Sequence, residues 1–243
     1  MINDIKDAFG HYFMDIYKER DVYGLVIERD DGYIDVDTYD YFAGYQFWPK
    51  RQKKIIKYIK GKVLDIGCGP GSHLLELKDR NYDVAGIDTS QLSVQICKKR
   101  GLKNIYPVAL NSLDSKIGIF DTFLMLGNNF GLMKNEKKAR EYLKKLSKVS
   151  NPEAVIIAET MDPYKTTNKF HKRYHKKNRE NGRLAGQLRV RARYKIYKTN
   201  WMEYLLVSKG EMKKIIKNTD WKIDRFINSI VGPGYIAVLK KKK

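Results

Sequence analysis

Residues 62–72 read Lys-Val-Leu-Asp-Ile-Gly-Cys-Gly-Pro-Gly-Ser, and residues 83–88 read Asp-Val-Ala-Gly-Ile-Asp. The two apolar runs predict buried strands, and the segment between them predicts a helix that begins after a glycine-rich turn. Such a βαβ unit binds adenosine-containing ligands at the carboxyl ends of its strands, where an acid after the second strand accepts hydrogen bonds from ribose hydroxyls. The stretch therefore predicts a nucleoside site in which Asp88 holds the ribose.

The glycine spacing in this turn indicates which adenosine ligand fits. Gly67, Gly69 and Gly71 form G-x-G-x-G, whereas the dinucleotide fingerprint is G-x-G-x-x-G. Asp65, just before the turn, would repel a pyrophosphate. The same carboxylate attracts the ammonium and sulfonium groups of S-adenosylmethionine, whose own carboxylate suits the free N–H groups of the following helix. We therefore expect S-adenosylmethionine as the cofactor and S-adenosylhomocysteine as its product.

At these residues the chain resembles the class I S-adenosylmethionine-dependent methyltransferases. Residues 63–71 are similar to the first motif of that family and residues 86–90 to its second; the resemblance covers 52–160 well and 209–239 by pattern. It implies an α/β, Rossmann-like, doubly wound fold with a seven-stranded, mostly parallel sheet. The alternative is a glycine-rich turn in another doubly wound protein. The resemblance also implies a set of residues that bind the cofactor: Asp65, Gly67, Gly69 and Gly71 on its methionine side and Asp88 on its ribose.

The remaining strands alternate with helices along the chain. Residues 104–109, 120–126 and 154–158 are short apolar runs bounded by turn residues, and they predict the third, fourth and fifth strands. Alternation of short buried strands with helices implies a parallel sheet covered by helices on both faces.

Three segments organise the chain around this sheet. Residues 1–51, rich in tyrosine, predict an N-terminal helical and irregular cap. Residues 52–160 and 209–243 predict the domain that binds S-adenosylmethionine. Residues 161–208 are too long for an ordinary connection and predict a basic insertion or lid after strand five.

A β-hairpin is expected within this insertion. Residues 187–196 alternate apolar and basic side chains with period two, and residues 201–207 predict the strand that pairs with them. The net charge of +20 is concentrated here, between Pro163 and Asn200. Such an excess is either an electrostatic footprint for RNA or another anion, or an ordinary lysine-rich solvated face.

Composition and termini bear on location and on metals. No apolar stretch approaches the roughly 20 residues that cross a bilayer, and residues 1–7 carry acids where a signal peptide would be basic and then apolar. We therefore expect a cytoplasmic protein without a membrane partner. Cys68 and Cys97 lack metal-like spacing, and His171 and His175 lie four apart without a third ligand, so no metal is expected.

Side chains after each strand should meet the cofactor, because ligands in open α/β sheets lie beyond the carboxyl ends of the strands. Gly127 lets the backbone approach the methionine portion, and Asn128 and Asn129 supply amides after strand four. For the two amides the alternative is a turn and helix cap. The further residues expected to border the cofactor are Cys68, His73, Thr89, Asn111, Ser112, Leu113 and Leu126.

Methyl transfer from a sulfonium is a direct displacement, so the enzyme mainly holds the acceptor in line and excludes water. A general base is needed only where the nucleophile must lose a proton. Candidates for it are Glu159, His11, Tyr41 and Tyr45, and the residues assigned to catalysis are Asn128, Asn129, Glu159 and Tyr45.

Three hypotheses for function follow. The first is a methyltransferase acting on a small molecule that may be anionic, since the aromatic cap and the hairpin resemble the lid of family members with small acceptors. The second is a tRNA or rRNA methyltransferase that grips phosphates through residues 165–198. The third is a protein that binds the cofactor without turnover. The substrate-binding residues expected under the first are Tyr41, Trp48, Arg189, Arg191 and Arg193. The acceptor atom and the oligomeric state cannot be inferred from these motifs.

Overall fold

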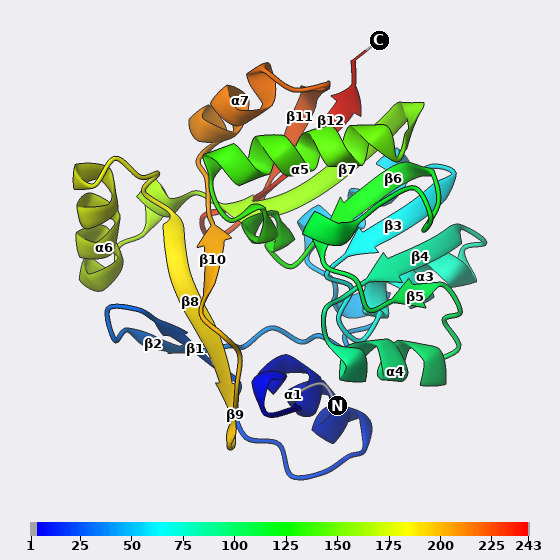
Figure 1. Cartoon of the computed structure of the whole chain (residues 1–243), viewed down its shortest axis with the longest axis horizontal. Helices are drawn as coiled ribbons and strands as arrows, with labels where there is room; N and C mark the ends of the chain where they lie inside the picture. The colour runs from blue at the N-terminus through cyan, green and yellow to red at the C-terminus, as the bar shows by residue number, and fades with distance from the viewer. Residues whose placement is uncertain (1–3, 243) are drawn as a thin grey trace.

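A computed structural model describes residues 4–242 of the chain. Its largest sheet contains β3 (Lys62–Ile66), β4 (Asp83–Ile87), β5 (Ile105–Tyr106), β6 (Phe120–Met125), β7 (Ser150–Met161), β11 (Trp221–Asn228) and β12 (Gly234–Lys241). The strand order is β11-β12-β7-β6-β3-β4-β5 (Figure 1). β3 to β7 are parallel, and β12 is antiparallel to both of its neighbours. This confirms the predicted seven-stranded, mostly parallel sheet.

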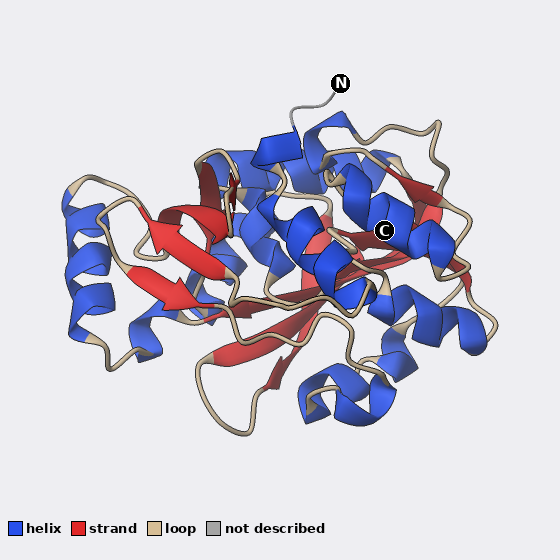
Figure 2. Ribbon diagram, turned by 90° about the horizontal axis from the view of Figure 1, so that it is seen from below, coloured by secondary structure: helices blue, strands red, loops and turns tan. Residues whose placement is uncertain are grey.

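Two hydrophobic cores lie on opposite faces of this sheet, because successive side chains of a strand point to opposite sides. On β6, Phe123 packs in one core and Leu124 in the other. The Phe123 core is covered by α5 (Glu136–Lys148) and α7 (Lys209–Lys217), and the Leu124 core by α3 (Ser72–Asp79) and α4 (Gln91–Lys99). Helices therefore cover both faces, as predicted (Figure 2).

A smaller antiparallel sheet lies beside the large one (Figure 1). It joins β8 (Gln187–Tyr194), β9 (Tyr197–Lys198) and β10 (Met202–Leu205) of the insertion with β1 (Val26–Arg29) and β2 (Ile34–Val36) of the N-terminal segment. The predicted hairpin is present as β8 paired with β10. However, β8 ends at Tyr194, and Ile196, expected on its apolar face, is 76% exposed in the turn that follows.

β1 and β2 correct the expectation of a purely helical and irregular cap. β1 pairs with β8, with Ile27 opposite Ala192 and Glu28 opposite Arg191, so segments about 165 residues apart share one sheet. Sequence reasoning missed these strands because they have only four and three residues, too few to give a clear strand signal.

Two longer helices attach to this smaller sheet. α1 (Ala8–Tyr17) packs between β8 and α4, where Ala8, Ala192 and Tyr194 form a separate small core. α6 (Lys169–Glu180) lies at the outer edge, beyond β8 (Figure 1). The short helical turns are η1 (Asp4–Lys6), η2 (Tyr45–Phe47), α2 (Lys50–Lys53), η3 (Ile56–Tyr58), η4 (Leu110–Ser112), η5 (Asn129–Met133) and η6 (Pro163–Lys165). Within residues 4–242 no helix is both long and apolar enough to cross a membrane.

Candidate functional site

The glycine turn between β3 and α3 has a backbone that only glycine adopts easily. Gly67, Gly69 and Gly71 have φ angles of +73°, +52° and +83°. A Cβ on Gly71 would lie 2.5 Å from Leu102, and one on Gly67 would lie 2.8 Å from the Asn129 side chain. The turn is therefore closely surrounded, and the structure brings these three predicted residues together at the carboxyl end of β3.

Cys68 fills the space below this turn. Its side chain is buried, and a hydrogen bond with Cys97 together with burial raises the pKa of its thiol well above the ordinary value. The Cys97 thiol donates to the carbonyl oxygen of Gly69 at 3.2 Å. A protonated thiol in this position supports the turn by packing and offers no nucleophile.

Asp65 is the least satisfied polar group at the turn. Its carboxyl group is 2% exposed, and Oδ2 has no hydrogen-bond partner among the described residues. Burial, reinforced by the charge of Asp88, raises the pKa of Asp65 to about 7. A buried carboxylate oxygen without a partner is unfavourable unless a ligand provides one, and a cation provides the strongest. The residue therefore fits the ammonium group of S-adenosylmethionine.

Asp88 is held at the carboxyl end of β4 by backbone donors. Its Oδ2 accepts from the Gly69 N–H at 2.9 Å and its Oδ1 from the Ser90 N–H at 2.8 Å. Burial raises the pKa of this carboxyl group too. Each carboxylate oxygen can accept a further bond, so a ribose hydroxyl can still be bound there.

The other residues predicted around the cofactor fall into two groups. Thr89, Asn111 and Ser112 are exposed near the carboxyl ends of β4 and β5. Leu113 and Leu126 are 1% and 3% exposed. Leu113 packs in the Phe123 core and Leu126 in the Leu124 core.

Glu159 organises the loop after β6. This carboxylate is fully buried on β7 and accepts from the Gly127 N–H at 2.8 Å, from Gln52 Nε2 at 2.8 Å and from Arg51 Nε at 2.5 Å. Both oxygens are engaged by donors, and Arg51 balances the charge. This geometry favours a positioning role over the predicted role as a general base.

The two asparagines after β6 have different surroundings. Asn129 Nδ2 donates to the carbonyl oxygens of Ile66 and Gly67 at 3.0 and 2.9 Å, so it fastens the loop to the glycine turn. Asn128 has a left-handed backbone, with φ of +65°. Its Oδ1 is buried and lacks a partner in the described part of the chain. Of the two, Asn128 has the amide that remains able to bind a ligand.

Aromatic side chains of the N-terminal segment cover the turn. A Cβ on Gly69 would lie 3.5 Å from the Phe13 ring, which is itself 4.8 Å from the Tyr41 ring. The Tyr41 carbonyl oxygen accepts from Ser72 Oγ at 2.7 Å, so the cap is tied to the first residue of α3. The Tyr39 ring lies 3.7 Å from the Cβ position of Gly127.

Hydrogen bonds connect these phenols to Asp37 and to β10. Tyr41 Oη donates to Asp37 Oδ2 at 2.6 Å, and Tyr204 Oη donates to the Asn128 carbonyl oxygen at 2.7 Å. Burial, with the charges of Glu159 and Asp65, raises the pKa of Tyr39 to about 12, and burial also raises the pKa values of Tyr41 and Tyr204. The phenols therefore stay protonated, which argues against Tyr41 as a general base. Sequence reasoning missed Phe13, Asp37, Tyr39 and Tyr204 as members of this group; the tyrosine-rich N-terminal segment was the only signal.

Other predicted residues pack against side chains outside the glycine turn. The Trp48 ring contacts the His73 ring at 4.7 Å, and burial lowers the pKa of His73 to about 4, as expected of a packing residue. Tyr45 stacks under the guanidinium of Arg80, at the opposite end of α3. His11 stacks on Tyr197. Tyr45 and His11 are therefore not placed to act at the glycine turn.

The arginines of β8 also stay apart from the turn. Arg191 makes two hydrogen bonds to Glu28, at 2.8 and 2.9 Å, and Arg193 approaches the same carboxylate at 3.5 Å. Arg189 and Arg191 lie over the Trp201 ring, at 5.8 and 4.5 Å from its centroid. Their face of β8 is opposite to Ala192 and Tyr194, which pack toward α1.

The described part of the chain has no cluster of side chains that could form a metal site. Across residues 4–242, no three histidine, cysteine, aspartate or glutamate side chains come together in a group that could hold a metal ion.

Comparisons with known proteins agree with this fold. A family model described as "Methyltransferase domain" matches residues 63–153. A Bacteroides fragilis S-adenosylmethionine-dependent methyltransferase, solved with S-adenosylhomocysteine, superposes with a TM-score of 0.84 at 22% identity, covering 100% of this chain and 98% of its own. A Methanosarcina mazei S-adenosylmethionine-dependent methyltransferase reaches 0.60 at 19% identity, covering 78% of this chain and 97% of its own.

A curated relative matches only part of the chain. Glycine/sarcosine N-methyltransferase of Halorhodospira halochloris is 28% identical over 151 residues, which is 60% of this chain and 54% of the relative. The chain thus spans about half the length of the curated relatives it matches. The chain thus has the Rossmann-like fold of these S-adenosylmethionine-dependent methyltransferases, and residues 63–153 match the methyltransferase domain that the glycine turn predicts.

The substitution Asp65→Asn should stabilise the protein free of ligand, and more so at higher pH. The pKa of Asp65 is raised in the folded state, so the folded chain binds an additional proton between about pH 4 and 7 and loses stability as pH rises through that window. Asparagine removes this dependence. Thermal unfolding should show a melting temperature several degrees above the wild type at pH 8 and a smaller difference at pH 5. A difference that is the same at both pH values would contradict the burial of a titrating Asp65.

Glu159→Gln should destabilise the protein by about 3 kcal/mol, because it removes the charge that pairs with Arg51 and leaves one acceptor oxygen where Arg51 and the Gly127 N–H each bind one. Glu153→Gln is the matched control on the same strand, since its side chain is 84% exposed, and it should change stability by less than about 0.5 kcal/mol. Urea denaturation measures both. Equal effects of the two substitutions would show that Glu159 does not hold the loop.

Proposed function

We propose that this chain transfers the methyl group of S-adenosylmethionine to a small-molecule acceptor bound under the aromatic cap. The observation that supports this most is the buried, unpartnered Oδ2 of Asp65 beside the glycine turn, which matches the cationic amino acid end of this cofactor. The Bacteroides fragilis neighbour, whose fold covers all of this chain, was solved with S-adenosylhomocysteine.

Different residues around the turn bind different parts of the cofactor. Asp65 accepts from the ammonium group, and the N–H groups at the start of α3 bind the carboxylate. Asp88 accepts from the ribose hydroxyls. When bound, S-adenosylmethionine would supply an electrophilic methyl carbon: the acceptor bonds to this carbon, and the electron pair of the broken C–S bond stays on the sulfur. The chain's own contribution is then to orient the two molecules and to exclude water.

The cap supports an enclosed acceptor. Phe13, Tyr39 and Tyr41 cover the turn, and the buried Asn128 amide is left to orient an acceptor beside Gly127. Entry of either molecule requires the cap to move away from the turn. The arginines of β8 contribute little, because Glu28 pairs with two of them. The Halorhodospira relative, named for methylation of glycine and sarcosine nitrogen, supports a small amine as the acceptor.

RNA is the second candidate acceptor, and the positively charged surface of α6 favours it. Its cationic side chains are solvent-exposed, and the only ion pair among the described contacts of this helix joins Lys176 to Glu180 at 3.8 Å. Contacts between such a helix and phosphates would make affinity fall steeply with salt. The basic residues of α6 are Lys169, Lys172, Arg173, Lys176, Lys177 and Arg179.

A labelling experiment separates the two acceptors. The purified chain is incubated with S-adenosylmethionine carrying a labelled methyl group, and either with total RNA or with a small-molecule extract. We expect label in the small-molecule fraction, because the Phe13 and Tyr39 rings cover the backbone at Gly69 and Gly127. Label in RNA would establish the second candidate, and label in neither fraction would contradict methyl transfer.

Asp88→Ala should weaken the binding of S-adenosylhomocysteine by about tenfold or more, since the ribose loses its acceptor. The matched control is Asp83→Ala, at the opposite end of the same strand, where the side chain is 57% exposed. Calorimetric titration measures both affinities. Unchanged binding by Asp88→Ala would remove this residue from the site, and equal loss in both variants would point to general destabilisation.

A further inference from the structure

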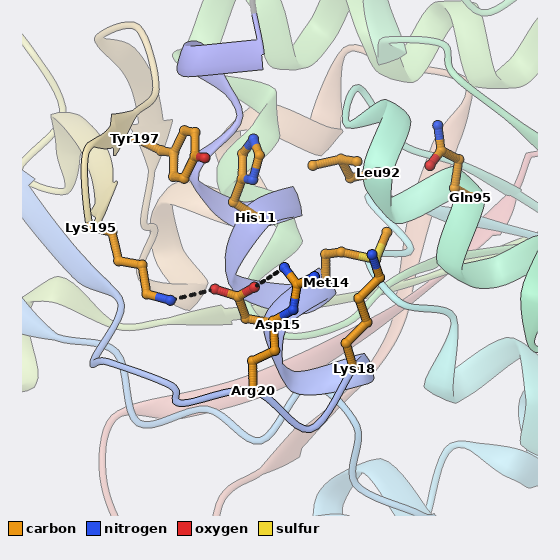
Figure 3. A pocket seen from close by; sticks show the side chains of 9 residues that line it. All are labelled: His11, Met14, Asp15, Lys18, Arg20, Leu92, Gln95, Lys195 and Tyr197. Atoms are coloured by element: carbon orange, nitrogen blue, oxygen red, sulfur yellow. Dashed lines mark hydrogen bonds and ion pairs between the residues drawn. The ribbon is translucent and has the colours of Figure 1, made fainter.

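A cavity of about 410 Å³ lies beside α1 (Figure 3). His11 and Asp15 line it, whereas Phe13, midway between them in sequence, covers Gly69. Residues two apart on a helix point in nearly opposite directions, at about 100° per residue. α1 therefore separates this cavity from the cofactor site. Its volume is within the roughly 300–1,000 Å³ of small-molecule sites.

Cations gather along one wall of the cavity. Asp15 Oδ2 accepts from Lys195 Nζ at 2.7 Å, and its Oδ1 lies 3.4 Å from Arg20 Nη1 (Figure 3). Lys18, one helical turn after Asp15, adds a third cation. Burial alone would raise the pKa of Asp15, but hydrogen bonds from Lys195 and Tyr194 lower it, so this carboxylate stays charged. The Asp15 carboxylate neutralises one of these three positive charges, and its two contacts fix the positions of Lys195 and Arg20.

A second wall is aromatic and apolar. The His11 and Tyr197 rings are stacked, with centroids 3.5 Å apart and planes inclined by 5°. Met14 of α1 and Leu92 of α4 add apolar surface beside them. Figure 3 shows the ring pair and the cations on neighbouring sides of the same space.

We propose that this cavity binds a small organic anion with a planar ring, such as an aryl phosphate or aryl carboxylate, outside the methyl-transfer site. Its anionic group pairs with Lys18, Arg20 and Lys195, and its ring packs against the His11–Tyr197 stack, with Met14 and Leu92 excluding water. Arginine and lysine favour phosphate and carboxylate groups, and the flat stack favours a flat ligand.

The cavity also joins three parts of the chain. Its walls come from α1, from α4 of the cofactor domain and from the turn between β8 and β9. α1 contacts the cofactor side through Phe13 over Gly69 and through Asp7, whose Oδ2 accepts from Ser90 Oγ at 2.7 Å. A ligand that ties α1 to α4 therefore stabilises the covered form of the glycine turn. This consequence, unlike the site itself, rests on the proposed function.

The binding site is tested by NMR titration of the full chain with phenyl phosphate. We expect saturable shifts of the His11 and Tyr197 ring signals, with a dissociation constant of about 1 mM or lower, as a ligand of this size reaches. The double substitution Lys18→Gln with Arg20→Gln should weaken binding about fivefold or more. Inorganic phosphate, which lacks the ring, should bind more weakly than phenyl phosphate.

The matched control removes the same charge elsewhere, by Lys172→Gln with Arg173→Gln on the exposed face of α6. It should leave the titration unchanged. The proposal is overturned if phenyl phosphate causes no saturable shifts, if both double variants weaken binding equally, or if inorganic phosphate binds as tightly. These outcomes require no cofactor, so they stand whether or not methyl transfer is found.

The coupling to the glycine turn is tested by the dissociation rate of S-adenosylhomocysteine. Saturating phenyl phosphate should slow dissociation severalfold in the wild type and not in the Lys18→Gln, Arg20→Gln variant. An unchanged rate in the wild type would overturn the coupling. Absence of S-adenosylhomocysteine binding would instead contradict the proposed function, while the titration with phenyl phosphate alone still decides the site.

Discussion

Asp65, one residue before the end of β3, has a buried carboxyl group, and one of its oxygens has no hydrogen-bond partner among the described residues. Such a group is unfavourable for the folded chain until a cation meets it. The turn that follows contains three glycines with positive φ, which have no side chains of their own to cover the backbone N–H groups. Folding and ligand binding therefore make opposite demands on Asp65, as is common where function requires a strained or unpaired group.

Contacts from distant segments hold this arrangement in place. Asn129 fastens the loop after β6 to the turn, and Glu159 joins the same loop to Arg51 and Gln52 at the start of the domain. These buried acceptors and donors are satisfied almost completely, so they fix the backbone. Asp65 Oδ2 on β3 and Asn128 Oδ1 in the loop after β6 are buried without a partner among the described residues.

Sequence reasoning succeeded where the signal was local. The turn glycines, the acid before them and the apolar strands of the large sheet are short-range patterns, and each lies where it was expected. It failed where partners are distant in sequence. Nothing near Arg191 indicates that Glu28, 163 residues away, neutralises it. Likewise, β2 has only three residues, and the tyrosines at 39, 41 and 204 could be recognised as one group only after β1 had paired with β8. Tyr45 was expected at the site but packs against Arg80, at the far end of α3. The direction of that helix is not indicated by composition.

The most direct test of the role of Asp65 is the pH dependence of S-adenosylhomocysteine affinity, measured by calorimetry at pH 5.5 and pH 8. Under the proposed function the ionised carboxylate binds the ammonium group, and burial raises the pKa of Asp65 to about 7. Affinity should therefore be about tenfold or more lower at pH 5.5, and Asp65→Asn should bind weakly at both pH values. Equal affinity of the wild type at the two pH values, or tight binding by Asp65→Asn, would contradict the account.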